Sequence, residues 1–206
     1  MTAADLLRAD LQLVISLVPE GSRVLDLGCG DGSLMAHLRD ERGCDVRGIE
    51  LAPSEIAAAI GRGLSVIQGD LDAGLRGCPD NSFDVVVLSQ TIQVMRNPAL
   101  VLREMLRVGK RGIITFPNFG HWRVRGYLTL KGRMPVSESI PFSWYDTPNI
   151  HHTTIKDFRQ FVAANGGEIE QEIPLVAGEW RREIREVRVL PNLFADTAVA
   201  VVTARH

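Results

Sequence analysis

The sequence has little cysteine, no long apolar run and almost no net charge, and each shortage excludes a class of protein. Its three cysteines, Cys29, Cys44 and Cys78, are odd in number and form no C-x-x-C pair, so we expect reduced thiols. No apolar run reaches the roughly 18 residues of a membrane span, and the first residues lack a secretory signal pattern. A net charge of −2 gives no electrostatic basis for binding nucleic acid. We therefore expect a cytoplasmic protein with no nucleic-acid or membrane partner.

Common catalytic and metal-binding signatures are also missing. Neither a G-x-S-x-G elbow nor a G-x-x-x-x-G-K-[ST] loop occurs. His121, His151 and His152 have no evident acidic partner in the sequence, and no cysteine or H-x-x-x-H spacing supports a metal site. We therefore predict no metal site, and the sequence assigns no catalytic residue.

What the sequence does contain is a regular alternation of strand and helix patterns. Apolar strand patterns occupy 23–27, 44–50, 64–68, 83–89 and 111–116, and helix patterns lie between them. Two later strands, 168–173 and 196–203, are predicted to pair antiparallel. With 206 residues the chain suits one domain over 1–206. We predict an α/β fold: a doubly wound, mostly parallel seven-stranded sheet with an antiparallel C-terminal edge strand.

Residues 23–32, RVLDLGCGDG, predict a nucleotide-type site. A buried strand is broken by Gly28, Gly30 and Gly32, and a helix pattern starts at Ser33. Glycine lets the backbone turn tightly and approach a ligand, and the free amides of a helix start face that ligand. Cys29, inside this turn, is expected to belong to the cofactor-binding site as a small buried side chain rather than as a nucleophile.

Acidic residues follow the ends of successive strands and narrow the choice of ligand. The glycine spacing is G-x-G-x-G rather than the dinucleotide G-x-G-x-x-G, and Asp26 would repel a pyrophosphate. Glu50 and Asp70 end the second and third strands. This set suits a ribose, an adenine amine and a cationic amino acid, and it is similar to the S-adenosylmethionine (SAM) site of class I methyltransferases. Binding of NAD is the next alternative, and a site that binds no nucleotide is the last.

The segment 117–151 interrupts the alternation and is rich in aromatic residues. Of the chain's twelve aromatic residues it holds six, together with several basic residues. A connection of this length is usually functional or disordered, and aromatics argue against disorder. Two interpretations stay open: a contact surface for a partner, or a cap on the ligand site. The residues concerned are Phe119, His121, Trp122, Arg123, Arg125, Trp144, Tyr145 and His151.

Several motifs together resemble the methionine biosynthesis protein MetW family. They are VLDLGCGDG at 24–32, SQTIQ at 89–93, FPNFGHWRVR at 116–125, GRMP at 132–135 and WYDTPNIH at 144–151. The resemblance implies a SAM-binding fold and an accessory role beside the homoserine O-acyltransferase MetX. Because SAM derives from methionine, we add the hypothesis that such a subunit is a feedback sensor of SAM or S-adenosylhomocysteine (SAH). The segment after the fourth strand lacks the Asn/Asp-Pro-Pro-Tyr-like tetrad of many methyltransferases. A methyltransferase with an unidentified small acceptor is the alternative, so enzyme activity is left open, and a third, weaker alternative is a fold relic without cofactor.

The predicted roles follow the parts of SAM or SAH. Gly28 and Gly30 are expected to let the backbone approach the amino-acid part, and Asp26 to orient its ammonium. Glu50 is expected to accept from the ribose hydroxyls. The remaining contacts are expected from Leu51 against the adenine, Asp70 at the adenine amine with Leu71 beside it, and Ser89 and Gln90 near the sulfur.

Overall fold

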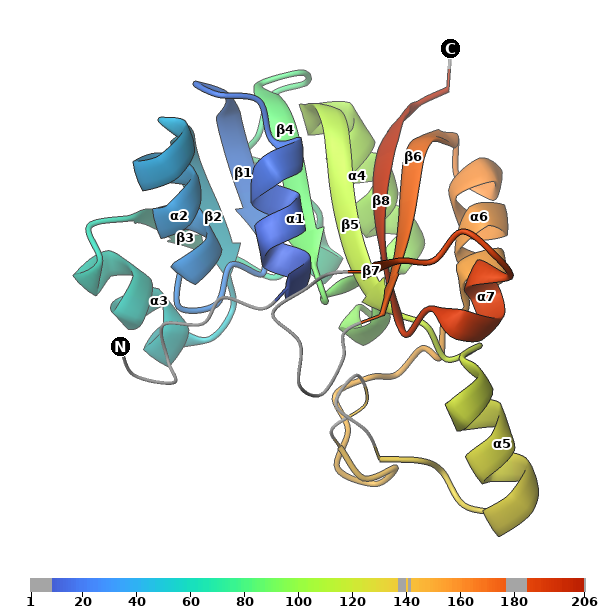
Figure 1. The fold of residues 1–206 in the computed structure, drawn as a ribbon. Helices are drawn as coiled ribbons and strands as arrows, with labels where there is room; N and C mark the ends of the chain where they lie inside the picture. The colour runs from blue at the N-terminus through green and yellow to red at the C-terminus, as the bar shows by residue number, and fades with distance from the viewer. Residues whose placement is uncertain (1–8, 137–139, 141, 177–184, 206) are drawn as a thin grey trace.

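An eight-stranded sheet forms the centre of the computed structural model, which describes residues 9–136, 140, 142–176 and 185–205 (Figure 1). The strand order is β3-β2-β1-β4-β5-β8-β6-β7. Neighbours from β3 to β5 pair in parallel, whereas β8 is antiparallel to both β5 and β6. The strands are β1 Arg23–Leu27, β2 Asp45–Glu50, β3 Ser65–Gln68, β4 Phe83–Ser89, β5 Gly109–Pro117, β6 Gly167–Val176, β7 Arg185–Glu186 and β8 Thr197–Ala204.

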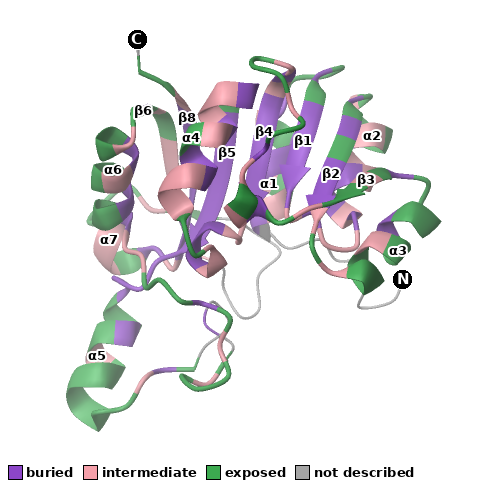
Figure 2. Cartoon of the chain, turned by 180° about the vertical axis from the view of Figure 1, so that it is seen from behind, coloured by how far each residue is buried: buried purple, intermediate pink, exposed green. Residues whose placement is uncertain are grey.

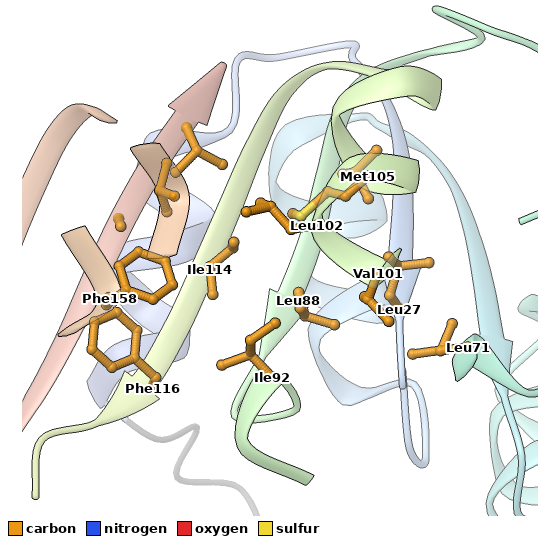
Figure 3. Close-up of a cluster of buried hydrophobic side chains, with 14 of the residues drawn as sticks. Leu27, Leu71, Leu88, Ile92, Val101, Leu102, Met105, Ile114, Phe116 and Phe158 are labelled. Carbon is orange, nitrogen blue, oxygen red and sulfur yellow. The ribbon is translucent and has the colours of Figure 1, made fainter. Parts of the chain in front are cut away.

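Helices cover both faces of the sheet, which makes the fold doubly wound (Figures 1 and 2). On one face α1 (Ala9–Leu17), α2 (Ser33–Arg42) and α3 (Pro53–Gly61) contribute to one buried apolar cluster. On the other face α4 (Pro98–Val108) and α6 (Ile155–Ala164) contribute to a second cluster (Figure 3). In it Phe116 and Phe158 stack with ring centroids 4.2 Å apart. The two clusters fix the sheet from both sides.

The predicted α/β class and parallel sheet are confirmed, with two differences at the C-terminal side. The sheet has eight strands rather than seven, because the two-residue β7 pairs with β6. The chain's last strand, β8, lies between β5 and β6 rather than at an edge. Its run Thr197–Ala204 is buried on both faces up to Val202. Such a continuous apolar run is typical of an interior strand.

Side chains cap two of the helix starts. The Asn97 side chain accepts a hydrogen bond from the Leu100 amide (3.1 Å), and Pro98 occupies the first turn of α4. Thr154 and Asp157 form a capping box at the start of α6. Between β3 and β4 the chain forms one short 3₁₀ helix, η2 (Leu71–Ala73).

The segment 117–151 contains a helix that the sequence pattern did not indicate. α5 (Trp122–Lys131) projects away from the sheet and ends at Gly132, whose φ is +62° (Figure 1). Val124 is its one buried residue. Because α5 presents no apolar stripe to its own domain, the periodicity on which helix prediction depends is absent.

Gly32 is a position where a side chain is expected to cost stability. Its φ is +78°, and an added Cβ would collide with Leu64 Cδ1 and lie 3.0 Å from Ala59 Cβ. Gly32→Ala should therefore lower the free energy of unfolding by about 1–3 kcal/mol through overpacking, in addition to backbone strain of about 1–2 kcal/mol. Gly21→Ala is the matched control, since Gly21 has a similar φ of +67° with nothing within 4 Å. Urea unfolding showing equal losses would contradict the packing argument.

Candidate functional site

The predicted site residues gather where the parallel strands end. β1, β2, β3 and β4 run in the same direction, so their carboxyl ends meet at one edge of the sheet. The turn after β1 has positive φ at all three of its glycines, Gly28 (+72°), Gly30 (+54°) and Gly32 (+78°). The amides of Gly28 and Cys29 donate to the Ile49 carbonyl at 2.8 and 3.2 Å. The end of β2 therefore holds the glycine turn in place.

Glu50 lies at the centre of this arrangement. Its Oε2 accepts from the Gly30 amide (2.9 Å), and its Oε1 accepts from the amides of Leu51 (2.7 Å) and Ala52 (2.9 Å). One carboxylate thus joins the glycine turn to the loop that leads into α3. A carboxylate offers about four lone-pair sites, so capacity remains for a donor from a ligand.

The electrostatics of the turn are acidic. Asp26, near the end of β1, is buried with 3% exposure. Burial raises the pKa of the Cys29 thiol to about 12, and the charges of Asp26 and Glu50 add to the shift. Because the thiolate is the nucleophile, a thiol with this pKa is unreactive at neutral pH. The interpretation of Cys29 as a small buried side chain agrees with these surroundings.

The residues after β2 and β3 divide into exposed and buried positions. Leu51 has 60% of its surface exposed, a suitable place for an apolar contact with a ligand. Asp70 is also exposed, and its side chain accepts from the Asp72 amide (2.9 Å) as the N-cap of η2. Leu71, in contrast, packs into the core near Leu27 and Val101 (Figure 3). Its predicted place beside a ligand remains a prediction, whereas its core contact is part of the fold.

The end of β4 forms a polar cluster that includes two residues sequence analysis missed. Ser89 Oγ lies 3.2 Å from Thr115 Oγ1, and the Gln90 amide donates to the Thr115 side chain and carbonyl at 3.0 Å each. Thr115 in turn donates to Asp10 Oδ2 (3.3 Å) on α1. The one sequence signal for this cluster was Thr115, a polar residue inside the apolar run of β5. Nothing in the sequence links Asp10 to a strand 105 positions later.

Most of the exposed aromatic residues in the described part of the chain gather on one projecting part of the molecule, which we call the aromatic lobe: residues 119–136, 140 and 142–151. Trp122, Trp144 and Tyr145 are 49%, 74% and 76% exposed. The rings of Trp144 and Tyr145 pack edge to face, 5.7 Å apart, and the Arg123 guanidinium lies 5.6 Å from the Trp122 ring centroid. Figure 2 shows α5 exposed along most of its surface. Large aromatic surface that its own chain leaves uncovered is typical of interaction sites.

Other predicted lobe residues anchor it to the domain. Phe119 is buried with Val124 and Ile140 and contacts the His152 ring, with centroids 4.5 Å apart. Arg125 Nε donates to the Gly120 carbonyl (2.6 Å), a hydrogen bond within the lobe itself. The His151 amide donates to the Gln93 carbonyl (3.0 Å).

Asn118, at the base of the lobe, connects it to two other parts of the chain. The Asn118 side chain donates to the Ala195 carbonyl (2.7 Å), beside α7 (Pro191–Phe194). Its oxygen accepts from the amides of Gly120 (2.9 Å) and Ile155 (3.4 Å), the latter at the start of α6. The base of the lobe is therefore fixed even though its surface is exposed.

His121 gives the base of the lobe a pH dependence. Burial lowers its pKa and the Arg123 charge adds to this, against a hydrogen bond with the main chain of Phe194 that acts to raise it. Since the folded pKa lies below the ordinary 6.5, the unfolded chain takes up the proton first as pH falls. Stability should then decline from about pH 6.5 downward through the folded pKa. In urea titrations at pH 7.5 and 5.5, His121→Gln should lose less stability on acidification than the parent chain. An equal loss would rule out His121 as the cause.

No helix in the described part of the chain is long and apolar enough to cross a membrane. The same residues contain no group of three or more His, Cys, Asp or Glu placed to hold a metal ion.

Comparison with solved structures identifies the fold. A SAM-dependent methyltransferase from Thermotoga maritima, described as a possible histamine N-methyltransferase, matches 96% of this chain and 88% of its own with a TM-score of 0.70 at 19% identity. A SAM-dependent methyltransferase from Archaeoglobus fulgidus matches 96% of this chain and 92% of its own with a TM-score of 0.69 at 17% identity. At these identities the similarity concerns the fold alone.

Comparison with sequences identifies the family. The chain is 37% identical over 202 residues to the bifunctional methionine biosynthesis protein MetXA/MetW of Rhodopirellula baltica, a match that covers 94% of this chain and 32% of that protein. A methyltransferase for 2-methyl-6-phytyl-1,4-hydroquinone from Synechocystis is 33% identical over 48% of this chain and 32% of its own length. The chain thus spans about a third of the length of these relatives. The profile of the family described as methionine biosynthesis protein MetW matches residues 8–202, so the chain belongs to the MetW family.

Proposed function

We propose that this chain is a SAM- or SAH-binding accessory subunit that supports the homoserine O-acyltransferase MetX. The observation that carries the proposal is the relative from Rhodopirellula baltica, whose name joins MetXA and MetW in one bifunctional protein. Two units kept on one polypeptide are always present together, which favours a joint function.

The chemistry of the site supports an adenosyl amino acid as the ligand. Asp26, Glu50 and Asp70 place carboxylates at three neighbouring strand ends. Carboxylates accept from an ammonium, a ribose diol and an adenine amine, and they attract the sulfonium charge of SAM. The glycine turn lets main-chain atoms come close to the ligand. When bound, SAM supplies an electrophilic methyl group and SAH does not, so SAH is the cleaner probe of binding.

The aromatic lobe supports a protein partner. Aromatic residues and arginine are enriched at the centres of protein interfaces. Trp122, Arg123, Trp144 and Tyr145 combine these residue types on one exposed part of the molecule. We propose the lobe as part of the surface that contacts the acyltransferase.

A methyltransferase with a small acceptor is the second candidate, and the cluster at the end of β4 favours it. The Asp10 carboxylate, only 9% exposed, lies beside the Thr115 hydroxyl there. A carboxylate next to the reacting end of a cofactor can take a proton from an acceptor. Transfer of labelled methyl from SAM to a lysate component, lost in Asp10→Asn, would support this function.

Two binding experiments test the first proposal. Calorimetry should show one SAH site per chain, and light scattering of a mixture with the acyltransferase should show a complex at micromolar concentration. Absence of the complex contradicts the accessory role, and absence of SAH binding contradicts the cofactor assignment. The two results are independent, so each half of the proposal can fail alone.

A further inference from the structure

One buried residue, Gln93, connects the end of β4 to the aromatic lobe. It lies in the short helix η3 (Ile92–Val94) and is 4% exposed. Its side-chain Nε2 donates to the Gln90 carbonyl (2.8 Å). Its main-chain carbonyl accepts from the amides of Ile150 (3.1 Å) and His151 (3.0 Å). A single residue therefore contacts both the strand end predicted to face the ligand and the last residues of the lobe.

The Gln90 side of this connection is strained. Gln90 has φ +51°, a left-handed conformation that is uncommon for residues other than glycine. It is held there by the two hydrogen bonds of its amide to Thr115. A residue that stays in such a conformation has surroundings that impose it, and positions of this kind cluster at ligand and switch sites. A ligand beside Ser89 and Gln90 would add contacts that hold the strained conformation.

The Gln93 side chain itself is incompletely satisfied. Among the described residues its buried Oε1 has no hydrogen-bond partner. A buried acceptor without a partner costs free energy. A shift of η3 that gave Oε1 a partner would recover this cost, so Gln93 is a point at which a change at Gln90 can be passed on to η3.

The C-terminal end of the aromatic lobe is also held by Gln93. Ile150 is 53% exposed, and Trp144 and Tyr145 lie five to six positions before it. The hydrogen bonds from the Ile150 and His151 amides to the Gln93 carbonyl fix the point where the lobe rejoins the domain before α6. A shift of η3 would therefore change the position of the exposed aromatic residues.

We propose that Gln93 is a positioning residue that couples occupancy of the ligand site to the affinity of the aromatic lobe for its partner. SAH or SAM holds Gln90 in its left-handed conformation, Gln90 holds Gln93, and Gln93 fixes Ile150 and His151 in the form that binds the acyltransferase. The coupling is reciprocal, so the acyltransferase tightens SAH binding by the same factor. This inference rests on the proposed function and adds its regulation.

The first test is a thermodynamic cycle. The Kd of the acyltransferase is measured without SAH and with saturating SAH, and we expect it to fall by about fivefold or more, the range usual for allosteric coupling. Gln93→Met keeps the side-chain length but removes the donor to Gln90 and the unpartnered acceptor. In Gln93→Met the acyltransferase Kd without SAH and the Kd with saturating SAH should differ by no more than about twofold, and the free energy of unfolding should not fall. Gln160→Met, at an exposed position on α6, is the matched control and should keep the full factor.

The second test uses the chain alone. Hydrogen exchange at the Ile150 and His151 amides should slow when SAH is added to the parent chain or to Gln160→Met, and should not slow in Gln93→Met. If SAH and the acyltransferase both bind but independently, and exchange at these amides is unchanged, the coupling is wrong and the proposed function stands. If either fails to bind, the coupling is wrong together with the half of the proposed function that requires that binding. If SAH lowers the acyltransferase Kd as much in Gln93→Met as in the parent chain, the proposed role of Gln93 is also wrong.

Discussion

Glu50→Gln is expected to weaken SAH binding by roughly 10- to 100-fold. A hydrogen bond to a charged group contributes about 1.5–3 kcal/mol, and about 1.4 kcal/mol corresponds to a factor of ten. In the structure both carboxylate oxygens already accept from main-chain amides, those of Gly30 on one side and Leu51 and Ala52 on the other. Glutamine keeps one oxygen and places an NH₂ group against the amides on the other side. It therefore loses the charge and also loosens the turn that receives the ligand.

Calorimetric titration with SAH measures this effect, and Glu55→Gln is the matched control. Glu55 is an exposed carboxylate on α3, and its Oε2 lies 3.9 Å from where a Gly30 Cβ would be. It shares the negative charge near the turn but has no predicted contact with the ribose. If both variants lose affinity equally, general electrostatics explains the loss. If Glu50→Gln binds as the parent chain does, the ribose assignment is wrong.

Replacing Trp122 and Arg123 together with alanine is expected to weaken acyltransferase binding by about 30-fold or more. Interface residues whose truncation costs about 2 kcal/mol or more are enriched in tryptophan and arginine. Trp122 and Arg123 are exposed and contact each other. Their truncation should leave the free energy of unfolding within about 0.5 kcal/mol of the parent value.

The control for the lobe is an exposed apolar residue at the opposite end of the sheet. Ile67 on β3 is 62% exposed, and β3 and β7 form the two edges of the sheet. Ile67→Ala should leave association unchanged. If the double variant associates with the acyltransferase as tightly as the parent chain, the lobe is not part of the interface.

The glycine turn and the carboxylate at the end of β2 could be predicted from the sequence because their signals are local. Gly28 and Gly30 closely follow one apolar strand pattern and Glu50 ends the next, and parallel strands bring such positions together. The contact between Asp10 and Thr115 could not be predicted, since it depends on how α1 packs on the sheet. Gln93 appeared in the sequence analysis only as the last residue of the SQTIQ motif. Its proposed role depends on a side-chain hydrogen bond to the Gln90 carbonyl and on main-chain hydrogen bonds from Ile150 and His151, for which the sequence has no signal.

The lobe shows the opposite case, in which composition was informative and periodicity was not. Six aromatic residues within 117–151 predicted a functional segment. The helix α5 was missed because its apolar residues do not repeat on one buried face. A segment that contacts a partner need not show the pattern of a helix packed on its own domain.

The accessory role is tested most directly by the initial rate of homoserine acylation by the acyltransferase of the same organism, with and without this chain. Both proteins are mixed at micromolar concentration after each is shown to be folded, and the Trp122→Ala/Arg123→Ala chain serves as the control. We predict a large gain in rate with the parent chain and a much smaller gain with the control. An unchanged rate would contradict the accessory role and favour a methyltransferase with its own acceptor.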